Sequence, residues 1–351
     1  MDTLTHGLLG AAASQAFFAK RLPRSAGLIG LVAGMAPDLD LFMGSGSDPV
    51  AGMIYHRQFT HSLIFIPLGA LLVACLFVWM KPFKGARPAV FAAAVVGYGL
   101  HGLLDACTSY GTLLLWPFSN HRVAWDIIAI VDPIFTVALL VGVIWTVVMR
   151  HARPARVAVC FAAVYLGFGF WQWNRAVGVQ HQLATARGHV IEHNRVLPLP
   201  GSLVVWRSVY LAAGDIYVDG VRVPWWKGAR VKTGGAARLA TFDTIVPPPM
   251  AERDDARRVF QVFAWFADGL IAPVDGASST VGDMRYAAEA SGLIPLWGMQ
   301  FDARGVDGPT RWRPSGSSRM RIVSAIWRAL VDDARDYRPV GEVLTPLQGR
   351  S

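Results

Sequence analysis

Imidazole, guanidinium and hydroxyl groups are gathered in one short stretch of this sequence, at the edge of a hydrophobic segment. His56 to Ser62 reads His-Arg-Gln-Phe-Thr-His-Ser, and residues 63–80 that follow contain no charge and no further histidine. Imidazole is the commonest protein metal ligand and the side chain most easily tuned near neutral pH. By itself this stretch is explained equally well by a helix cap and a surface group, so a metal site requires further residues of the same kind.

Such residues recur at three other points of the chain. His101 and Asp105 are four positions apart, so on a helix they share one face, with Cβ atoms about 6 Å apart, and can hold one ion between them. Asp38 and Asp40 are two apart, which directs them to one side only if that segment is extended. The convergence predicts a metal site, with a structural hydrogen-bond network as the alternative. The predicted ligands are His6, Asp38, Asp40, His56, His61, His101 and Asp105.

The ligand types suit zinc, manganese or iron, because His and Asp occur without a thiolate. We expect His56 to lie in a loop and Thr60 to cap the helix that follows. A carboxylate such as Asp40 or Asp132 could orient an attacking water, and Arg57 could neutralise an anionic substrate. Asp132 precedes a proline inside an apolar segment, so it is also readable as a ligand, a partner for an imidazole or a helix kink. Arg122 is an alternative to Arg57, whereas His121 and Asp126 of the same loop are expected to be solvated.

A second histidine pair fits a different pattern. His189-Val-Ile-Glu192-His193 matches HxxEH, in which two histidines one helical turn apart bind zinc and the glutamate acts as a general base. The segment is polar and follows Gly188. A solvated helix end is therefore the better interpretation.

The composition indicates a membrane protein with two regions. Of 351 residues, 53% are hydrophobic and 16% are charged, against about 25% charged in an ordinary soluble domain. Residues 1–173 hold only 11 of the 33 Lys/Arg and 7 of the 24 Asp/Glu. The net charge of +9 is divided almost evenly between the two regions, so no concentrated basic patch favours nucleic-acid binding. The three cysteines have no metal-binding spacing and are expected to pack as small hydrophobes.

Apolar segments near residues 4–19, 25–36, 63–80, 88–106, 127–149 and 157–173 predict about six membrane helices, of which the first two are short. The connections between these segments alternate in how many basic residues they hold. Nine basic residues occur on one side of the membrane, and only Arg57 and Arg122 on the other. The side rich in positive charge is usually cytoplasmic, so the predicted site faces outwards. The nine are Lys20, Arg21, Arg24, Lys81, Lys84, Arg87, Arg150, Arg153 and Arg156.

The predicted fold is mainly α: a polytopic helical membrane domain over residues 1–173, a helical linker over 174–200 and a small β-rich soluble domain over 201–351. Residues 203–211 and 215–224 alternate as strands do, with Asp219-Gly220 expected as a hairpin turn. Val259 to Phe266 is predicted as a further strand. Met320 to Trp327 is readable as either strand or helix.

Several of these motifs together resemble a known family. They are Met1-Asp-Thr-Leu-Thr-His6, Pro37-Asp-Leu-Asp40, His56-Arg-Gln-Phe-Thr-His-Ser62, His101-Gly-Leu-Leu-Asp105, Ser109-Tyr-Gly-Thr112, Trp116-Pro-Phe-Ser119 and Asp132-Pro133. In this order they resemble the YdjM/YbcI-type family of bacterial inner-membrane proteins, described as metal-dependent hydrolases, over about the first 150 residues. The resemblance implies a location in the bacterial inner membrane.

The order of ligands is also similar to that in the helical zinc-dependent phospholipase C and single-strand nuclease superfamily. That resemblance implies a polynuclear zinc site that cleaves phosphoesters. This chain lacks the N-terminal tryptophan and the second His and HxxxE/D set of those enzymes, so one or two ions are expected. The family is also described as binding the LexA repressor, and no motif of this chain maps onto that function.

We therefore expect a membrane-bound metal-dependent hydrolase. Its substrate would be a small molecule or a lipid, and a lipid or lipid-linked phosphoester fits best. The alternative is a non-catalytic membrane scaffold or regulator-binding protein. The C-terminal domain is expected on the extracytoplasmic side.

Overall fold

A computed structural model describes residues 1–22, 25–43, 48–80, 83, 85–252, 254–274, 276, 279–301, 311–314 and 336–348. The chain divides into two compact units. The first comprises residues 1–44 and 54–170, and the second comprises residues 45–53 and 171–351.

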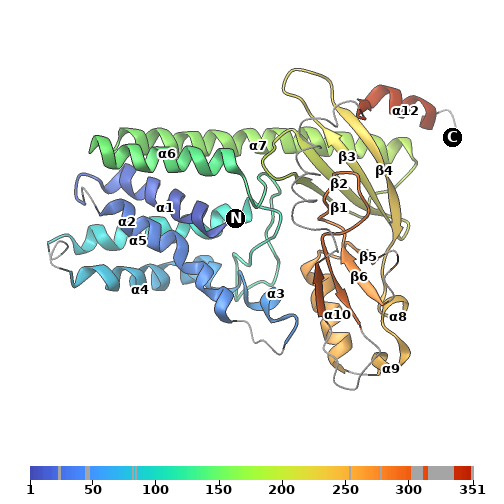
Figure 1. Cartoon of the computed structure of the whole chain (residues 1–351), viewed down its shortest axis with the longest axis horizontal. Helices are drawn as coiled ribbons and strands as arrows, with labels where there is room; N and C mark the ends of the chain where they lie inside the picture. Colours follow the sequence, from blue (N-terminus) through green and yellow to red (C-terminus); the bar gives the residue numbers. More distant parts are fainter. Residues whose placement is uncertain are drawn as a thin grey trace. The chain divides into compact units, whose positions relative to one another are not determined.

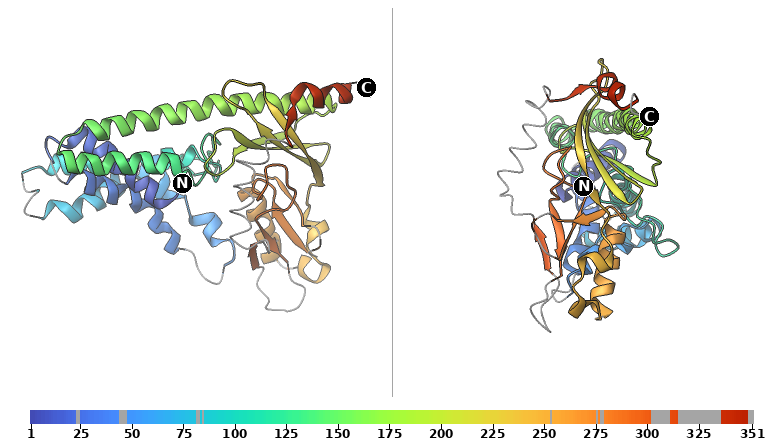
Figure 2. Two further views of the ribbon diagram at one scale, coloured as in Figure 1. Left: turned by 45° about the horizontal axis from the view of Figure 1, so that its top comes forward. Right: turned by 90° about the vertical axis from the view of Figure 1, so that its right-hand side faces the viewer.

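The first unit is helical, and its helices lie side by side (Figures 1 and 2). Its elements are α1 (Thr3–Phe18), α2 (Ala26–Met35), the 3-10 helices η1 (Ala36–Met43), η2 (Phe59–His61) and η3 (Leu63–Phe65), α4 (Ile66–Val78), α5 (Arg87–Ala106) and α6 (Pro133–Met149). α3 (Ala51–Tyr55) lies at the unit boundary, and α7 (Arg153–Ala186) runs as one helix from the first unit into the second.

Local sequence explains where two of these helices begin. The Asp2 carboxylate accepts a hydrogen bond from the backbone N–H of Thr5 and caps α1. Asp132 caps α6 in the same way through the N–H of Phe135, and Pro133 occupies the first turn, where its missing N–H costs nothing. Asp132-Pro133 is therefore a helix start instead of a kink.

Three helices are long and apolar enough to cross a membrane: 26–43, 87–106 and 153–186. The pair 51–61 and 63–78, bent by 52°, makes a fourth if it is one span. The prediction of six apolar helices is not confirmed within the described residues, because α1 has 16 residues and α6 has 17. The segment expected over 25–36 is longer than predicted, since η1 continues it to Met43.

The core of the helical unit depends on close backbone approach. A Cβ atom at Gly10 would collide with the carbonyl oxygen of Gly30, and one at Gly30 would collide with that of Gly10. α1 and α2 therefore touch backbone to backbone, as small residues permit in membrane helices. α5 packs against both helices, and the buried residues around Ile29, Val90 and Tyr98 complete the core.

The second unit holds two antiparallel sheets. The five-stranded sheet has the order β1-β2-β3-β4-β9, and the four-stranded sheet the order β5-β6-β7-β8. The strands are β1 (His193–Pro198), β2 (Val205–Ala212), β3 (Asp215–Arg222), β4 (Arg230–Arg238), β5 (Ile271–Pro273), β6 (Thr280–Asp283), β7 (Trp297–Gln300), β8 (Arg311–Pro314) and β9 (Arg338–Pro339). The helices are α8 (Phe242–Ile245), α9 (Pro248–Ala251), α10 (Asp254–Phe266) and α12 (Val340–Gln348).

Both faces of the five-stranded sheet are covered. Successive side chains of β2 point to opposite faces of the sheet, so each face needs its own packing partners. Trp206 packs with Ala176 and Leu183 of α7. Val209, from the opposite face, packs with Leu270 and other residues of the region that holds the second sheet. The expected helical linker 174–200 thus contains the end of α7 and strand β1.

Two local predictions for this unit were wrong. The hairpin turn between β2 and β3 is Ala213-Gly214, both with positive φ, and Asp219-Gly220 lies inside β3. Residues 259–266 form the second half of helix α10 instead of a strand. The segment Met320–Trp327 lies outside the described residues.

Candidate functional site

Histidine and aspartate side chains from four elements of the helical unit meet in one buried cluster. His6 comes from α1, Asp38 and Asp40 from η1, His61 from η2, and His101 and Asp105 from α5. All six are buried. His56, the seventh predicted ligand, lies just after α3 and contacts the cluster through Asp40.

The centre of the cluster is formed by four polar atoms. Nε2 of His61 lies 2.9 Å from Nε2 of His101, 3.7 Å from Oδ1 of Asp38 and 3.3 Å from Oδ2 of Asp105. Nε2 of His101 lies 3.4 Å from the same Asp38 oxygen and 3.5 Å from the same Asp105 oxygen. Donor atoms bound tetrahedrally at about 2.0–2.1 Å are about 3.3 Å apart. Each histidine nitrogen is therefore spaced from the other, and from the two carboxylate oxygens, as the ligands of one such ion are.

One oxygen atom at this centre has no hydrogen-bond partner among the described residues. It is Oδ2 of Asp105, which is buried. Leaving a buried carboxylate oxygen without a partner costs free energy, and a bound cation would remove this cost. The groups His6–His101–Asp105 and Asp38–His61–His101 could each hold a metal ion.

Asp38 and Asp40 lie on opposite sides of the His61 ring. Asp38 faces Nε2 of His61, whereas Oδ2 of Asp40 lies 3.2 Å from Nδ1 of the same ring. Asp40 also accepts hydrogen bonds from the hydroxyl of Thr60 and the backbone N–H of Arg57, and it lies 2.7 Å from Nδ1 of His56. Asp40 thus orients two imidazoles from outside the centre, as carboxylates commonly do for metal-binding histidines.

His6 stacks on His101, with ring centroids 3.7 Å apart. Its Nε2 lies 2.9 Å from Oδ1 of Asp105, and its Nδ1 is buried without a hydrogen-bond partner among the described residues. The amino group of Met1 contacts the same Asp105 oxygen.

Arg57 is a buried cation of the site. Its guanidinium lies 3.0 Å from Oδ1 of Asp105, donates to the hydroxyl of Thr108 and stacks over the ring of Tyr110. Its backbone is left-handed, with φ of 65°, and is held by a hydrogen bond to Asp40. Arg57 was predicted to neutralise an anionic substrate, and the structure buries it against Asp105, a predicted ligand.

Asp132 is engaged outside the cluster. Besides capping α6, its carboxylate accepts a hydrogen bond from the hydroxyl of Tyr165. Arg122 is directed at the carbonyl groups of Tyr110 and Gly111. His121 is exposed in its loop, as expected, whereas Asp126, which was also expected to be solvated, is buried. Thr60 donates to Asp40, while α4 begins later, after Phe65, so the predicted cap is wrong.

Some contacts of the site could not be predicted from the sequence. The Thr3 hydroxyl donates to Asp38, and the carbonyl oxygen of Gly34 lies 2.6 Å from Nδ1 of His101. Both contacts depend on how α1, α2 and α5 pack. Neither residue type is distinctive enough to be selected from spacing alone.

The HxxEH segment does not have the helical geometry that this zinc motif requires. α7 ends at Ala186, and His189 lies in the connection before β1, so the two histidines are not a helical turn apart. His189 contacts the Tyr210 hydroxyl and His193 contacts Asp268, while Glu192 accepts from the N–H of Ala213. The expected solvated helix end is likewise replaced by the entry to a strand.

Residues 1–176 match the YdjM inner membrane protein family. The chain belongs to this family. The match contains every residue of the His/Asp cluster, and most of the second unit lies beyond it. The inner membrane protein YbcI of Escherichia coli (strain K12) is 28% identical over 131 residues, which are 36% of this chain and 75% of that protein. No solved structure matches the chain. It is therefore an inner membrane protein whose family region carries a buried His/Asp group able to hold a metal ion.

Proposed function

We propose that this protein is a membrane-embedded hydrolase that uses a metal ion, with zinc the best match, held by His61, His101, Asp38 and Asp105. The observation that carries the proposal is the set of five distances, between 2.9 and 3.7 Å, that join the four donor atoms. His and carboxylate ligands at tetrahedral spacing suit zinc, although manganese and iron accept the same ligands.

The charge of the cluster also supports a bound cation. Asp38, Asp40 and Asp105 are three buried carboxylates. Arg57 and the amino group of Met1 offset two of them, so neutral imidazoles leave an excess negative charge among the described residues. Buried charge of one sign is expensive in a membrane. A bound cation would offset this excess without requiring a protonated histidine.

A zinc ion held there supplies Lewis-acid chemistry and activates water near neutral pH. His56 is placed to handle the proton. With Nδ1 donating to Asp40 at 2.7 Å, its Nε2 is left free to accept a proton, and its side chain is still 14% exposed. Arg57 would complement the negative charge that grows on the substrate.

The surroundings of the site favour a lipid or lipid-linked phosphoester. Leu39, Leu41 and Phe42 of η1 are exposed, and they alternate with or follow the buried Asp38 and Asp40. A substrate that diffuses within the membrane would meet these apolar side chains first. An anionic phosphoryl group would then be drawn towards Arg57 and the cation.

The test combines metal content with an activity screen. Protein purified in detergent is expected to hold at least one transition-metal ion per chain and to cleave a phosphodiester or phosphomonoester in mixed micelles. His101→Ala should lose both properties, and the matched His193→Ala, outside the cluster, should keep both. Metal-dependent cleavage of peptides alone would overturn the phosphoester assignment.

We also propose that the site and the second unit face the extracytoplasmic side. Nine basic residues against two in the alternate connections support this orientation. A cysteine at Ser119 should react with an impermeant thiol reagent in intact cells, whereas one at Ser25 should not, after the native cysteines are replaced. The reverse labelling would place the site in the cytoplasm.

A scaffold that binds a regulator is the second candidate, because Asp105 is already paired with Arg57, His6 and the amino group of Met1. A network that neutralises itself in this way could be structural. A metal-free, inactive wild-type protein would favour this candidate. Cytoplasmic labelling of the site would in addition make a repressor partner such as LexA testable by co-purification.

A further inference from the structure

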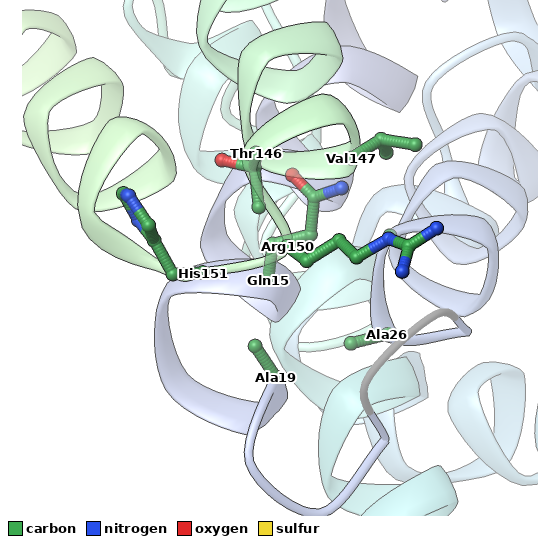
Figure 3. Close-up of a pocket in the computed structure, with 8 residues that line it drawn as sticks. Gln15, Ala19, Ala26, Thr146, Val147, Arg150 and His151 are labelled. Atoms are coloured by element: carbon green, nitrogen blue, oxygen red, sulfur yellow. The ribbon is translucent and has the colours of Figure 1, made fainter.

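A second site lies in the helical unit, at the end opposite the His/Asp cluster. A cavity of about 420 Å³ opens where α1 and α6 end and α2 begins, a size typical of small-ligand pockets. Figure 3 shows its lining side chains. Gln15 lies nine residues after His6 on α1, so the two sites are about 13 Å apart along that helix.

The pocket contains a buried acceptor without a partner. Gln15 is only 6% exposed, and its Oε1 has no hydrogen-bond partner among the described residues. In Figure 3 its amide is directed towards Thr146, whose own hydroxyl donates back to the carbonyl of Gly142. Thr146 therefore does not satisfy the Gln15 oxygen. The pocket has a place for a ligand that donates a hydrogen bond.

The mouth of the pocket is positively charged. Arg150 and His151 line it, and Figure 3 shows the Arg150 side chain extended towards Ala26, at the start of α2. The connections that flank it, residues 19–25 and 150–152, contain basic but no acidic residues. A ligand with a net negative charge is favoured over a zwitterion or a cation, and a guanidinium suits a phosphate group.

The three helices that meet at the pocket also carry exposed hydrophobic side chains. Phe17, Leu28 and Val148 are exposed by 68%, 52% and 69% on helices α1, α2 and α6, which meet at the pocket. These are positions where acyl chains would lie against a membrane protein. A ligand that enters with its polar end can therefore keep its hydrocarbon part along the helices.

We propose that this pocket binds the headgroup of an anionic phospholipid of the phosphatidylglycerol type. Its phosphate meets Arg150 and its glycerol hydroxyls donate to Gln15. The acyl chains continue along the apolar faces of the three helices. The pocket is separate from the metal site and does not depend on the proposed hydrolysis.

The experiment measures lipid binding to the full chain in detergent, by native mass spectrometry and by thermal melting. Phosphatidylglycerol should bind at one molecule per chain and raise the melting temperature by several degrees, and phosphatidylcholine should do neither. Arg150→Asn, which tolerates the left-handed backbone at that position, should weaken binding about tenfold. Gln15→Leu should weaken it several-fold.

Arg153→Gln is the matched control, because it removes the same charge from an exposed position outside the pocket lining. It should leave the affinity within about twofold, and no variant should change the metal content. Equal loss in Arg153→Gln would overturn the proposal in favour of general attraction to a basic surface. Stabilisation by inorganic phosphate alone, equal to that by the lipid, would assign the site to a free anion instead. Equal binding of phosphatidylcholine would also contradict it.

Discussion

Nδ1 of His101 lies 2.6 Å from the carbonyl oxygen of Gly34. Because a carbonyl can only accept, this contact places the ring proton on Nδ1 and leaves the lone pair of Nε2 directed at His61, Asp38 and Asp105. The end of α2 thus fixes the tautomer of a histidine on α5. A backbone carbonyl of α2 therefore sets which nitrogen of His101 on α5 is available to bind a metal ion.

The first prediction concerns occupancy. His101→Ala removes a central donor atom, and Asp105→Ala removes the carboxylate that meets five neighbours. Each should lower the metal bound per chain by about tenfold or more, measured by elemental mass spectrometry. His193→Ala, whose ring pairs with Asp268 in the second unit, should retain the wild-type content. Full occupancy in both cluster variants would refute the site.

The second prediction separates a ligand from an orienting residue. Asp40→Asn keeps an acceptor beside His61 and His56 but removes the charge, so metal affinity should fall by about 10–100-fold without being abolished. Asp38→Asn removes a charged ligand atom and should cost more. The measurement is a competition titration against a chelator. If Asp40→Asn lost metal as fully as Asp38→Asn, Asp40 would be a ligand itself.

The third prediction tests helix packing. Gly30→Ala places a methyl group against the backbone of Gly10 and should destabilise the helical unit by about 1–3 kcal/mol. Gly167→Ala on α7 meets nothing within 4 Å and should be neutral or stabilising by up to about 1 kcal/mol. Thermal unfolding in detergent, followed by circular dichroism, compares the two. An equal effect of both substitutions would mean that α1 and α2 are not in backbone contact.

The fourth prediction is a pH dependence in the second unit. Burial would raise the pKa of Asp268, but hydrogen bonds from His193 and Arg195 and the charge of Arg195 outweigh it and hold the pKa below its usual value. The resulting stability is complete above the unfolded pKa of about 3.9 and is lost as the pH falls through the folded pKa.

Because Asp268 is 43% exposed, the contribution should be below about 1 kcal/mol. Asp268→Asn should therefore be slightly less stable than wild type at pH 7, and the gap should narrow below about pH 4. Melting curves of both proteins at several pH values give the comparison. A gap that stays constant down to pH 3 would show that the ion pair is not its source.

The sequence predicted the parts of the site that depend on local geometry. His101 and Asp105 face each other because a helix brings residues four apart together. The separation of Asp38 and Asp40 to the two sides of the His61 ring was not readable, since it depends on the 3-10 geometry of η1 and on where η2 packs. Burial of Arg57 against Asp105 is likewise a tertiary property.

The errors in the second unit also have physical causes. Asp219-Gly220 resembled a turn, yet Asp219 is buried in β3 because Arg187 supplies two hydrogen bonds to its carboxylate. The strand expected from Val259 is helical. Val259, Phe260 and Phe263 are buried at a helical spacing, while Arg257 and Arg258 are exposed.

The backbone contact between Gly10 and Gly30 has a consequence for how an ion would exchange. The backbone contact allows α1 and α2 to pack in only one position relative to each other. His6 and Asp38 are therefore already ordered by folding, before any ion binds. The conformational entropy that is lost when the ligands come together is then lost during folding, and metal binding does not add to this loss. A chelator should empty such a site while the helices stay folded, unlike a zinc finger, which unfolds when its metal is removed.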